Sequence, residues 1–205
     1  MSSDNKTISV HQIDTSLFRE ELEKRITIPE GAFEQLLELW EYRSFKKNEV
    51  IMKADEVPKW SLFVLKGCLR QFLVTDKGDE RIVYFAEERH FIGDLPALRN
   101  SQPSVFTFQA IEPCELLTIN AKNWKEAQQR FTWWTEAYIN GYQRWTMILQ
   151  QQLADAASLS AEEQYARLLK TKPNLLLRVP QHYIASYLGI SPETLSRVRK
   201  KMTTL

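Results

Sequence analysis

The segment from Gln181 to Lys200 has the residue types and spacing of two short helices joined by a tight turn. Ala185 is small enough for a close contact between helices, and Gly189 tolerates the positive φ that such a turn requires. The apolar positions that would face the junction are Ile184, Leu188, Ile190, Leu195 and Val198. Because small, glycine and apolar positions all fit at once, the segment predicts a helix-turn-helix.

The second helix of this motif begins at a defined residue and exposes polar side chains. Ser191 is a good N-cap, and Pro192 suits the first turn because its missing N–H would have had no partner there. In a recognition helix, Arg can pair with guanine and Glu can accept from cytosine. We therefore predict base contacts from Glu193 and Arg197, with Ser196 as an additional candidate. The side chains that suit phosphate contacts are Ser191, Thr194, Arg199, Lys200 and Lys201.

The charge of the chain is divided unevenly. Residues 178–205 carry five basic side chains and one acid, whereas the remainder carries 22 basic and 25 acidic residues. A basic end on a mildly acidic body is typical of a nucleic-acid contact surface. No run of about 18 apolar residues occurs, and the start from Met1 to Val10 is polar, so we expect a cytoplasmic protein without a membrane partner.

The elements ahead of the motif change in character along the chain. Pro29 at a first-turn position precedes Phe33, Leu36, Leu37 and Trp40, whose spacing predicts a short amphipathic helix. From Tyr42 to Asn120, short β-rich runs alternate with turn residues, which is typical of a barrel, roll or sandwich. These runs are Glu49–Met52, Ser61–Leu65, Leu69–Val74, Arg81–Phe85, Thr107–Ile111 and Glu115–Ile119.

A long helix is predicted after the strands. Trp134, Tyr138, Gly141, Trp145 and Ile148 recur at alternating steps of four and three, which places them on one helical face. This stripe could pack on the strands or form a dimer seam, and both can hold along different parts of the helix. The Ser160–Glu163 capping box then opens another helix that ends at Lys172-Pro173.

On these features the chain resembles the Crp/Fnr superfamily of bacterial transcription regulators over roughly Ala32 to Met202. The resemblance implies an α+β fold with a jelly-roll-like β-roll sensor over 1–120, a dimerisation helix over 121–157 and a helix-turn-helix domain over 158–205. It also implies a homodimer on an inverted-repeat operator, with double-stranded DNA and RNA polymerase as partners. The Glu, Ser and Arg of Pro192–Arg197 are similar to the Fnr-type pattern, which implies a half-site related to TTGA.

The run Phe91-Ile92-Gly93-Asp94-Leu95 is similar to the family's phosphate-binding cassette. By that similarity, the expected effector pocket consists of Phe91, Gly93, Asp94, Leu95, Ser104 and Val105. The family's cassette arginine is missing, because its place reads Gln102-Pro103-Ser104-Val105-Phe106. Burying an anionic phosphate without a cation is costly, which argues against cyclic AMP or cyclic GMP as effector unless Arg81 or Arg99 substitutes.

Other cofactors and activities find little support in the sequence. The distant cysteines Cys68 and Cys114 cannot supply an iron–sulfur cluster, and we expect each to be a small buried side chain. The histidines, His11, His90 and His182, have no paired pattern for haem or another metal. A cupin-type enzyme would need several histidines in the β-rich region, which has one, so we expect a non-enzyme.

One alternative function stays open at this point. The helical end could bind another protein, which would make the chain a sensor or interaction module without DNA binding. The sequence stops at Leu205, just after the recognition helix, whereas many relatives add a β-wing. We therefore expect base readout without the wing's backbone contacts.

Overall fold

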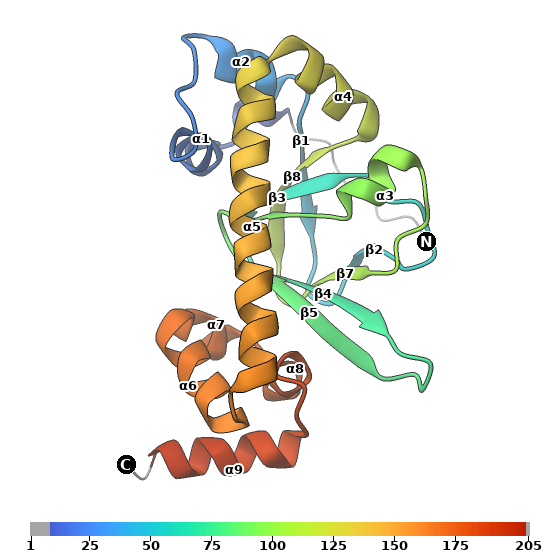
Figure 1. Cartoon of the computed structure of the whole chain (residues 1–205). Coiled ribbons are helices and arrows are strands. Elements are labelled where there is room, and N and C mark those ends of the chain that lie inside the picture. The colour runs from blue at the N-terminus through green and yellow to red at the C-terminus, as the bar shows by residue number, and fades with distance from the viewer. Residues whose placement is uncertain (1–8, 204–205) are drawn as a thin grey trace. The chain divides into compact units, whose positions relative to one another are not determined.

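The computed structural model describes residues 9–203 (Figure 1). Within this range the chain divides into two compact units, one made of residues up to 71 and 85–142, the other of residues 72–84 and 143 onward. The predicted functional division into 1–120, 121–157 and 158–205 remains a prediction. Most of the polar start, Met1–Val10, and the last two residues lie outside the described residues.

The first unit is built around a β-roll, as the strand pattern predicts. In the described residues, strands form two four-stranded sheets with the orders β1-β8-β3-β6 and β2-β7-β4-β5. Antiparallel pairing joins β3 to β8, with Phe63 opposite Leu117, and β1 to β8, with Tyr42 opposite Leu117. The strands are β1 (Glu41–Phe45), β2 (Val50–Met52), β3 (Ser61–Lys66), β4 (Leu69–Val74), β5 (Glu80–Ala86), β6 (Phe91–Ile92), β7 (Thr107–Ala110) and β8 (Cys114–Ile119).

Two of these strands are absent from the sequence interpretation. Strand β6 has only two residues, and it is a strand because Phe91 and Ile92 pair with Phe63 and Leu62. Strand β1 reads Glu-Tyr-Arg-Ser-Phe, in which polar residues interrupt the apolar pattern. Pairing partners far along the chain therefore created strands that local propensity did not indicate.

Helices cover the β-roll and enclose an aromatic core. Their bounds are η1 (Val10–Gln12), α1 (Ser16–Glu23), α2 (Ala32–Leu37), α3 (Leu95–Asn100) and α4 (Ala121–Arg130). Phe18 of α1 contacts the rings of Trp40 and Phe63 at centroid distances of 4.9 Å. Helix α2 begins at Ala32, after Gly31 with a φ of +70°, so placing Pro29 in its first turn was wrong. Trp40 lies beyond the helix and is nevertheless buried.

The segment expected as one helix from residue 121 is divided in two. Phe131 adopts an extended conformation, with φ −127° and ψ 98°, and its buried side chain joins the aromatic core. Helix α5 (Thr132–Ser158) follows with 27 residues. Its first turns bury Trp133, Trp134 and Ala137, so this part of the apolar stripe packs on the chain itself.

The second unit holds the later part of α5, the C-terminal helices and most of the β4–β5 hairpin, residues 72–84. Its helices are α6 (Ala161–Thr171), α7 (Pro173–Arg178), α8 (Gln181–Tyr187) and α9 (Pro192–Thr203). The predicted capping box is confirmed: Ser160 Oγ accepts from the Glu163 N–H at 3.3 Å, and Glu163 Oε2 accepts from the Ser160 N–H at 2.8 Å. Arg167 pairs with Asp155, which ties α6 to the end of α5.

Candidate functional site

The predicted pair of short helices joined by a tight turn is confirmed in α8 and α9. Ile184 and Ala185 of α8 are buried together with Leu195 and Val198 of α9, so the junction is apolar on both sides. Gly189 has a φ of +67°, and no heavy atom lies within 4 Å of the position of a Cβ. The glycine is therefore required for its backbone conformation and not for a close contact.

The first turn of α9 is ordered by hydroxyl groups. Ser191 Oγ accepts from the Thr194 N–H at 3.2 Å, which is the N-cap bond expected from the sequence. The Ser191 hydroxyl also donates to Thr194 Oγ1, and Arg197 Nη2 donates to the same oxygen, each at 3.2 Å. Thr194 thus links the cap to the guanidinium of Arg197.

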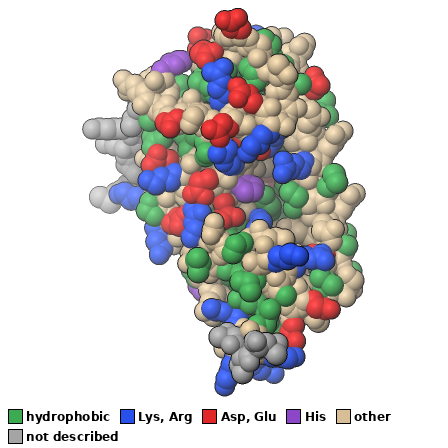
Figure 2. All heavy atoms as spheres, turned by 90° about the vertical axis from the view of Figure 1, so that its left-hand side faces the viewer, with side chains coloured by type: hydrophobic (Ala, Val, Ile, Leu, Met, Phe, Trp, Pro, Cys, Tyr) green, Lys and Arg blue, Asp and Glu red, His purple; other side chains and the backbone are tan. Residues whose placement is uncertain are grey.

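Charged groups are exposed on the face of α9 that points away from α8. Glu193, Ser196, Arg197 and Lys200 are exposed, whereas Thr194 and Arg199 are half-buried. The hydroxyl of Ser191 is the main cause that lowers the pKa of Glu193, so this carboxylate is ionised at neutral pH. Blue basic side chains gather at the lower end of Figure 2, where α9 lies in Figure 1.

One predicted phosphate contact has an intramolecular partner. Lys201 Nζ lies 2.7 and 2.9 Å from the two carboxylate oxygens of Glu162 on α6. Both side chains are substantially exposed, so the pair is weak and exchangeable. The sequence offered no sign of this contact because the two residues are 39 positions apart.

The cassette region lies where β6 leads into α3. Gly93 has a φ of +150°, and a Cβ there would lie 3.3 Å from the Cα of Ser61, so a side chain would crowd the neighbouring strand. Asp94 is the N-cap of α3, because its Oδ1 accepts from the Ala97 N–H at 3.2 Å. The glycine and the acid of the cassette therefore both shape the backbone.

The polar groups of the expected pocket are satisfied by one another. Asp94 Oδ2 accepts from the Ser104 hydroxyl at 2.9 Å, and Ser104 Oγ accepts from the Phe106 N–H at 3.1 Å. Ser104 is 1% exposed and Leu95 is buried, whereas Val105 is 64% exposed. In the described residues, neutral donors hold the Asp94 carboxylate.

Two arginines were suggested as substitutes for the missing one. Arg99 lies in the same unit as Asp94, whereas Arg81 lies in the other unit. Arg99 is exposed in the last turn of α3, at the opposite end of the helix from Asp94, and Arg81 is exposed on the hairpin tip of the other unit. The sequence interpretation missed Arg70, which is buried in β4 and donates to Gln109 Oε1 at 2.8 Å. The sequence signal for this buried arginine was its position in the β-rich run Leu69–Val74.

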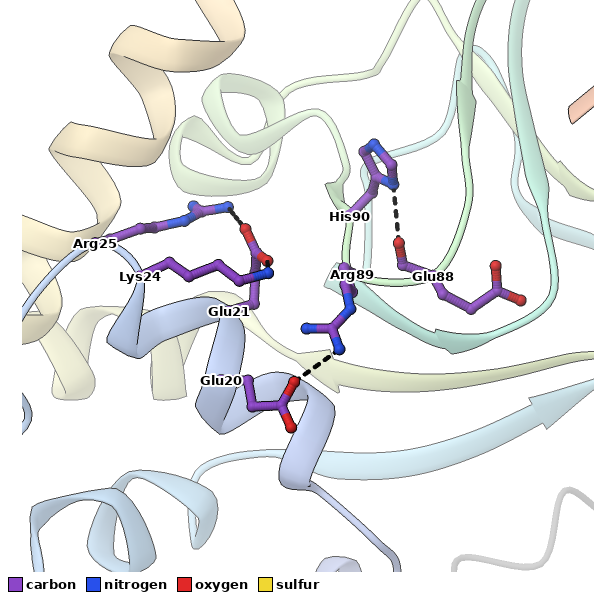
Figure 3. A network of polar contacts seen from close by, with 7 residues as sticks. All are labelled: Glu20, Glu21, Lys24, Arg25, Glu88, Arg89 and His90. Atoms are coloured by element: carbon purple, nitrogen blue, oxygen red, sulfur yellow. Dashed lines mark hydrogen bonds and ion pairs between the residues drawn. The ribbon is translucent and has the colours of Figure 1, made fainter. Parts of the chain in front are cut away.

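Phe91, the first residue of the expected pocket, packs against the aromatic core. Its ring contacts Phe63 at 4.8 Å and Phe18 at 5.8 Å between centroids. The guanidinium of Arg25 covers the ring at 4.9 Å and donates to Glu21 Oε1 at 3.0 Å, as Figure 3 shows for the ion pair. Phe91 is thereby packed between aromatic rings and a guanidinium, and it remains partly exposed.

Two further ion pairs, one of them with the same Glu21, are drawn near this arginine (Figure 3). Glu21 also accepts from Lys24 at 3.1 Å, and Arg89 donates to Glu20 at 2.7 Å. Burial opposes ionisation of Glu21, but the hydrogen bonds and charges of Arg25 and Lys24 outweigh it and lower the pKa. Helix α1 is thus joined by the Glu20–Arg89 ion pair to the segment that precedes β6.

The two cysteines lie closer together than their sequence separation suggested. Cys114 Sγ is 3.5 Å from the carbonyl oxygen of Cys68, and both side chains are buried, as expected. Burial is the largest cause that raises the pKa of Cys114 to about 11. Within residues 9–203, no group of three or more His, Cys, Asp or Glu side chains could hold a metal ion. Nor does any described helix have the length and apolarity to cross a membrane.

Comparison with known proteins agrees with this arrangement. Residues 42–131 match the family model described as the cyclic nucleotide-binding domain. FixK2 from Bradyrhizobium japonicum is similar in structure, with a TM-score of 0.68 and 19% identity over 80% of this chain and 84% of that one. The c-di-GMP responsive global regulator CLP of Xanthomonas campestris gives 0.67 and 19% over 85% and 91%.

The likeness extends across the β-roll, the long helix and the C-terminal helices. The chain has the Crp/Fnr fold. Another example of this fold, the catabolite activator protein of Thermus thermophilus, matches with a TM-score of 0.54 and 21% identity over 86% of this chain and 84% of that one. No curated protein sequence matches the chain. Two of these neighbours are described as a global regulator and a catabolite activator protein.

Proposed function

We propose that this chain is a sequence-specific regulator that binds double-stranded DNA through α9. The observation that carries the proposal is the exposed set of Glu193, Ser196 and Arg197 on a helix whose opposite face is anchored by Leu195 and Val198. An ionised carboxylate and a guanidinium can accept from cytosine and donate to guanine in the major groove. Their position in the N-terminal half of the helix suits base contact.

The proposed active form is a homodimer joined through the later turns of α5. Apolar side chains are exposed along this part of the helix, with Met147 at 69% and Leu153 at 73% exposure. Ile139, Tyr142 and Ile148 are also exposed. A second copy of the helix would remove this surface from water. Two recognition helices would then lie about one helical turn apart on an inverted repeat.

The proposed effector, if the β-roll binds one, is not a cyclic nucleotide. Asp94 and Ser104 already satisfy each other, and the charge argument from the missing arginine still applies. The proposal includes RNA polymerase as a partner at the promoter only by resemblance to the family. It assigns no iron–sulfur cluster, haem or other metal.

The experiment starts from a selection of bound sequences out of a random DNA pool, with and without cyclic AMP and cyclic GMP. We expect inverted repeats that are enriched equally under all three conditions. Binding to the selected operator is then measured by fluorescence anisotropy across a range of salt concentrations. Because phosphate contacts release counterions, the affinity should fall steeply with salt.

The decisive variant is Arg197→Ala, with Arg130→Ala as its matched control. Both changes remove one exposed guanidinium, but Arg130 lies on α4 and pairs with Glu126. We expect a loss of about 1–3 kcal/mol in operator binding for Arg197→Ala, with relaxed specificity at one base pair. Unchanged binding and specificity in this variant would refute the assignment of base contacts.

An interaction module without DNA binding is the second candidate. It is favoured by Leu177 of α7, which is 86% exposed and would suit contact with another protein. A chain of this kind would enrich no sequence from the pool and would show no steep dependence on salt.

A further inference from the structure

One serine of α8 satisfies the edge of the β4–β5 hairpin. Ser186 Oγ accepts from the Ile82 N–H at 3.1 Å and donates to the Glu80 carbonyl oxygen at 2.8 Å. Among the described strands β5 is the last of its sheet, so these two groups lie on an edge where no other described strand pairs. The hydroxyl therefore takes the place of a neighbouring strand's peptide group.

The contact constrains α8 closely. Only one rotatable bond separates the hydroxyl of a serine from its backbone. Two simultaneous hydrogen bonds to β5 therefore hold α8 close to the strand. The next residue, Tyr187, accepts from Gln152 Nε2 of α5 at 2.5 Å. The C-terminal end of α8 is thus bonded on two sides immediately before the Gly189 turn.

A second contact joins the same hairpin to the helices. Lys172, at the junction of α6 and α7, places its Nζ 5.3 Å from the centre of the Tyr84 ring, and Tyr84 is buried. Both this contact and the Ser186 contact lie within the second compact unit. Residues 72–84 of the hairpin therefore belong to the second unit, although β4 and β5 are strands of the β-roll.

We infer that the Ser186 bridge to β5 positions the recognition helix for simultaneous contact with two half-sites. This inference rests on the proposed DNA-binding function. The bridge does not cover the reading face, because Glu193, Ser196 and Arg197 remain exposed while it is formed. It restricts the orientation of α8 and α9 and leaves their surface accessible. In a dimer, two recognition helices whose orientation is already restricted lose less orientational entropy on binding one operator than two freely moving ones.

The bridge itself is tested by amide hydrogen exchange at Ile82 in the full chain. In Ser186→Ala the Ile82 N–H loses its acceptor, so we expect its exchange to become about two- to tenfold faster. Ser186→Thr retains a hydroxyl and should restore the slower exchange. Ser158→Ala is the matched control, because the Ser158 hydroxyl donates only to Ala154 O of its own helix, at 2.7 Å. Equal exchange at Ile82 in wild type and Ser186→Ala would overturn the inference.

The positioning role is tested by comparing a full operator with a single half-site. We expect Ser186→Ala to weaken binding to the full operator about two- to tenfold and to leave half-site binding unchanged. Ser186→Thr should restore the ratio, and Ser158→Ala should not alter it. An unchanged ratio in Ser186→Ala would overturn the positioning role. If the random pool yields no enriched sequence, the proposed function fails, whereas the exchange at Ile82 still reports on the bridge.

Discussion

Gly141 of α5 makes room for the side chain of Arg25. A Cβ at position 141 would lie 2.1 Å from Arg25 Nη1 and 3.2 Å from its Cζ. Ordinary contact between such atoms needs about 3.5 Å, so the guanidinium would have to move by about 1.4 Å. Arg25 is held by Glu21 and by the ring of Phe91, and only 16% of its side chain is exposed. Gly141→Ala should therefore displace a constrained group.

The expected size of the effect follows from opposing contributions. Replacing glycine by alanine within a helix ordinarily stabilises by about 1 kcal/mol. Displacing Arg25 weakens a charge-assisted hydrogen bond of about 1.5–3 kcal/mol and a cation–π contact of about 0.5–1 kcal/mol. Partial rehydration of the displaced guanidinium offsets some of this loss. We expect Gly141→Ala to lower the free energy of unfolding by about 1–2 kcal/mol.

The sign should reverse when Arg25 is removed. In an Arg25→Ala background, Gly141→Ala should raise the free energy of unfolding by about 1 kcal/mol, because only the helix preference remains. The assay is urea unfolding followed by tryptophan fluorescence, since Trp40, Trp124 and Trp134 lie in the core of the first unit. The double-mutant cycle then gives the coupling between the two sites. If Gly141→Ala has the same effect in both backgrounds, the steric explanation is refuted.

Three further results are expected. Glu21 has a folded-state pKa below its ordinary value of 4.5, so its stabilising effect is present above that pH and is lost as the pH falls through the folded-state pKa. Glu21→Gln should flatten this part of the curve of unfolding free energy against pH. An unaltered curve would contradict the lowered pKa. Asp94→Ala should cost about 1–2 kcal/mol of unfolding free energy without any ligand, since it removes the cap of α3 and the partner of Ser104; calorimetric denaturation measures this, and a neutral effect would show that these bonds do not stabilise the fold. The pKa of Cys114 is raised to about 11, so iodoacetamide should label it slowly in the native chain at pH 8 and rapidly after unfolding; rapid native labelling found by mass spectrometry would disprove its protection.

Helix α9 and the turn before it were the part of the candidate site whose local structure the sequence could predict. Ser191, Gly189 and the buried positions Leu195 and Val198 each have a role that depends on nearby residues, so their spacing indicated the turn and the cap. The β-roll was likewise indicated by alternating strands and turns. Strand β6 was missed because its two residues are extended only through pairing with β3.

The cassette shows the limit of local reasoning. Its residues are predicted from a resemblance to line an effector pocket, which stays a prediction. The structure packs Phe91 against the aromatic core and pairs Asp94 with Ser104. Those partners come from α1, β3 and the segment after α3, and no spacing within the cassette reveals them. A buried polar group needs a hydrogen-bond partner, and only the folded structure shows which residue supplies it.

By itself, the sequence determined the order of β-rich and helical segments, the start of α9 and the charged residues that α9 exposes. These features depend on caps, glycine conformations and periodicity, which act over a few residues. Only the tertiary structure decided that Arg25 covers Phe91, that Lys201 pairs with Glu162 and that Ser186 bonds to the edge of β5. The physical reason is that hydrogen bonds and ion pairs form between groups that are close in space. Ser186 and Ile82 are 104 positions apart in the sequence, and nothing in that separation predicts that they lie side by side.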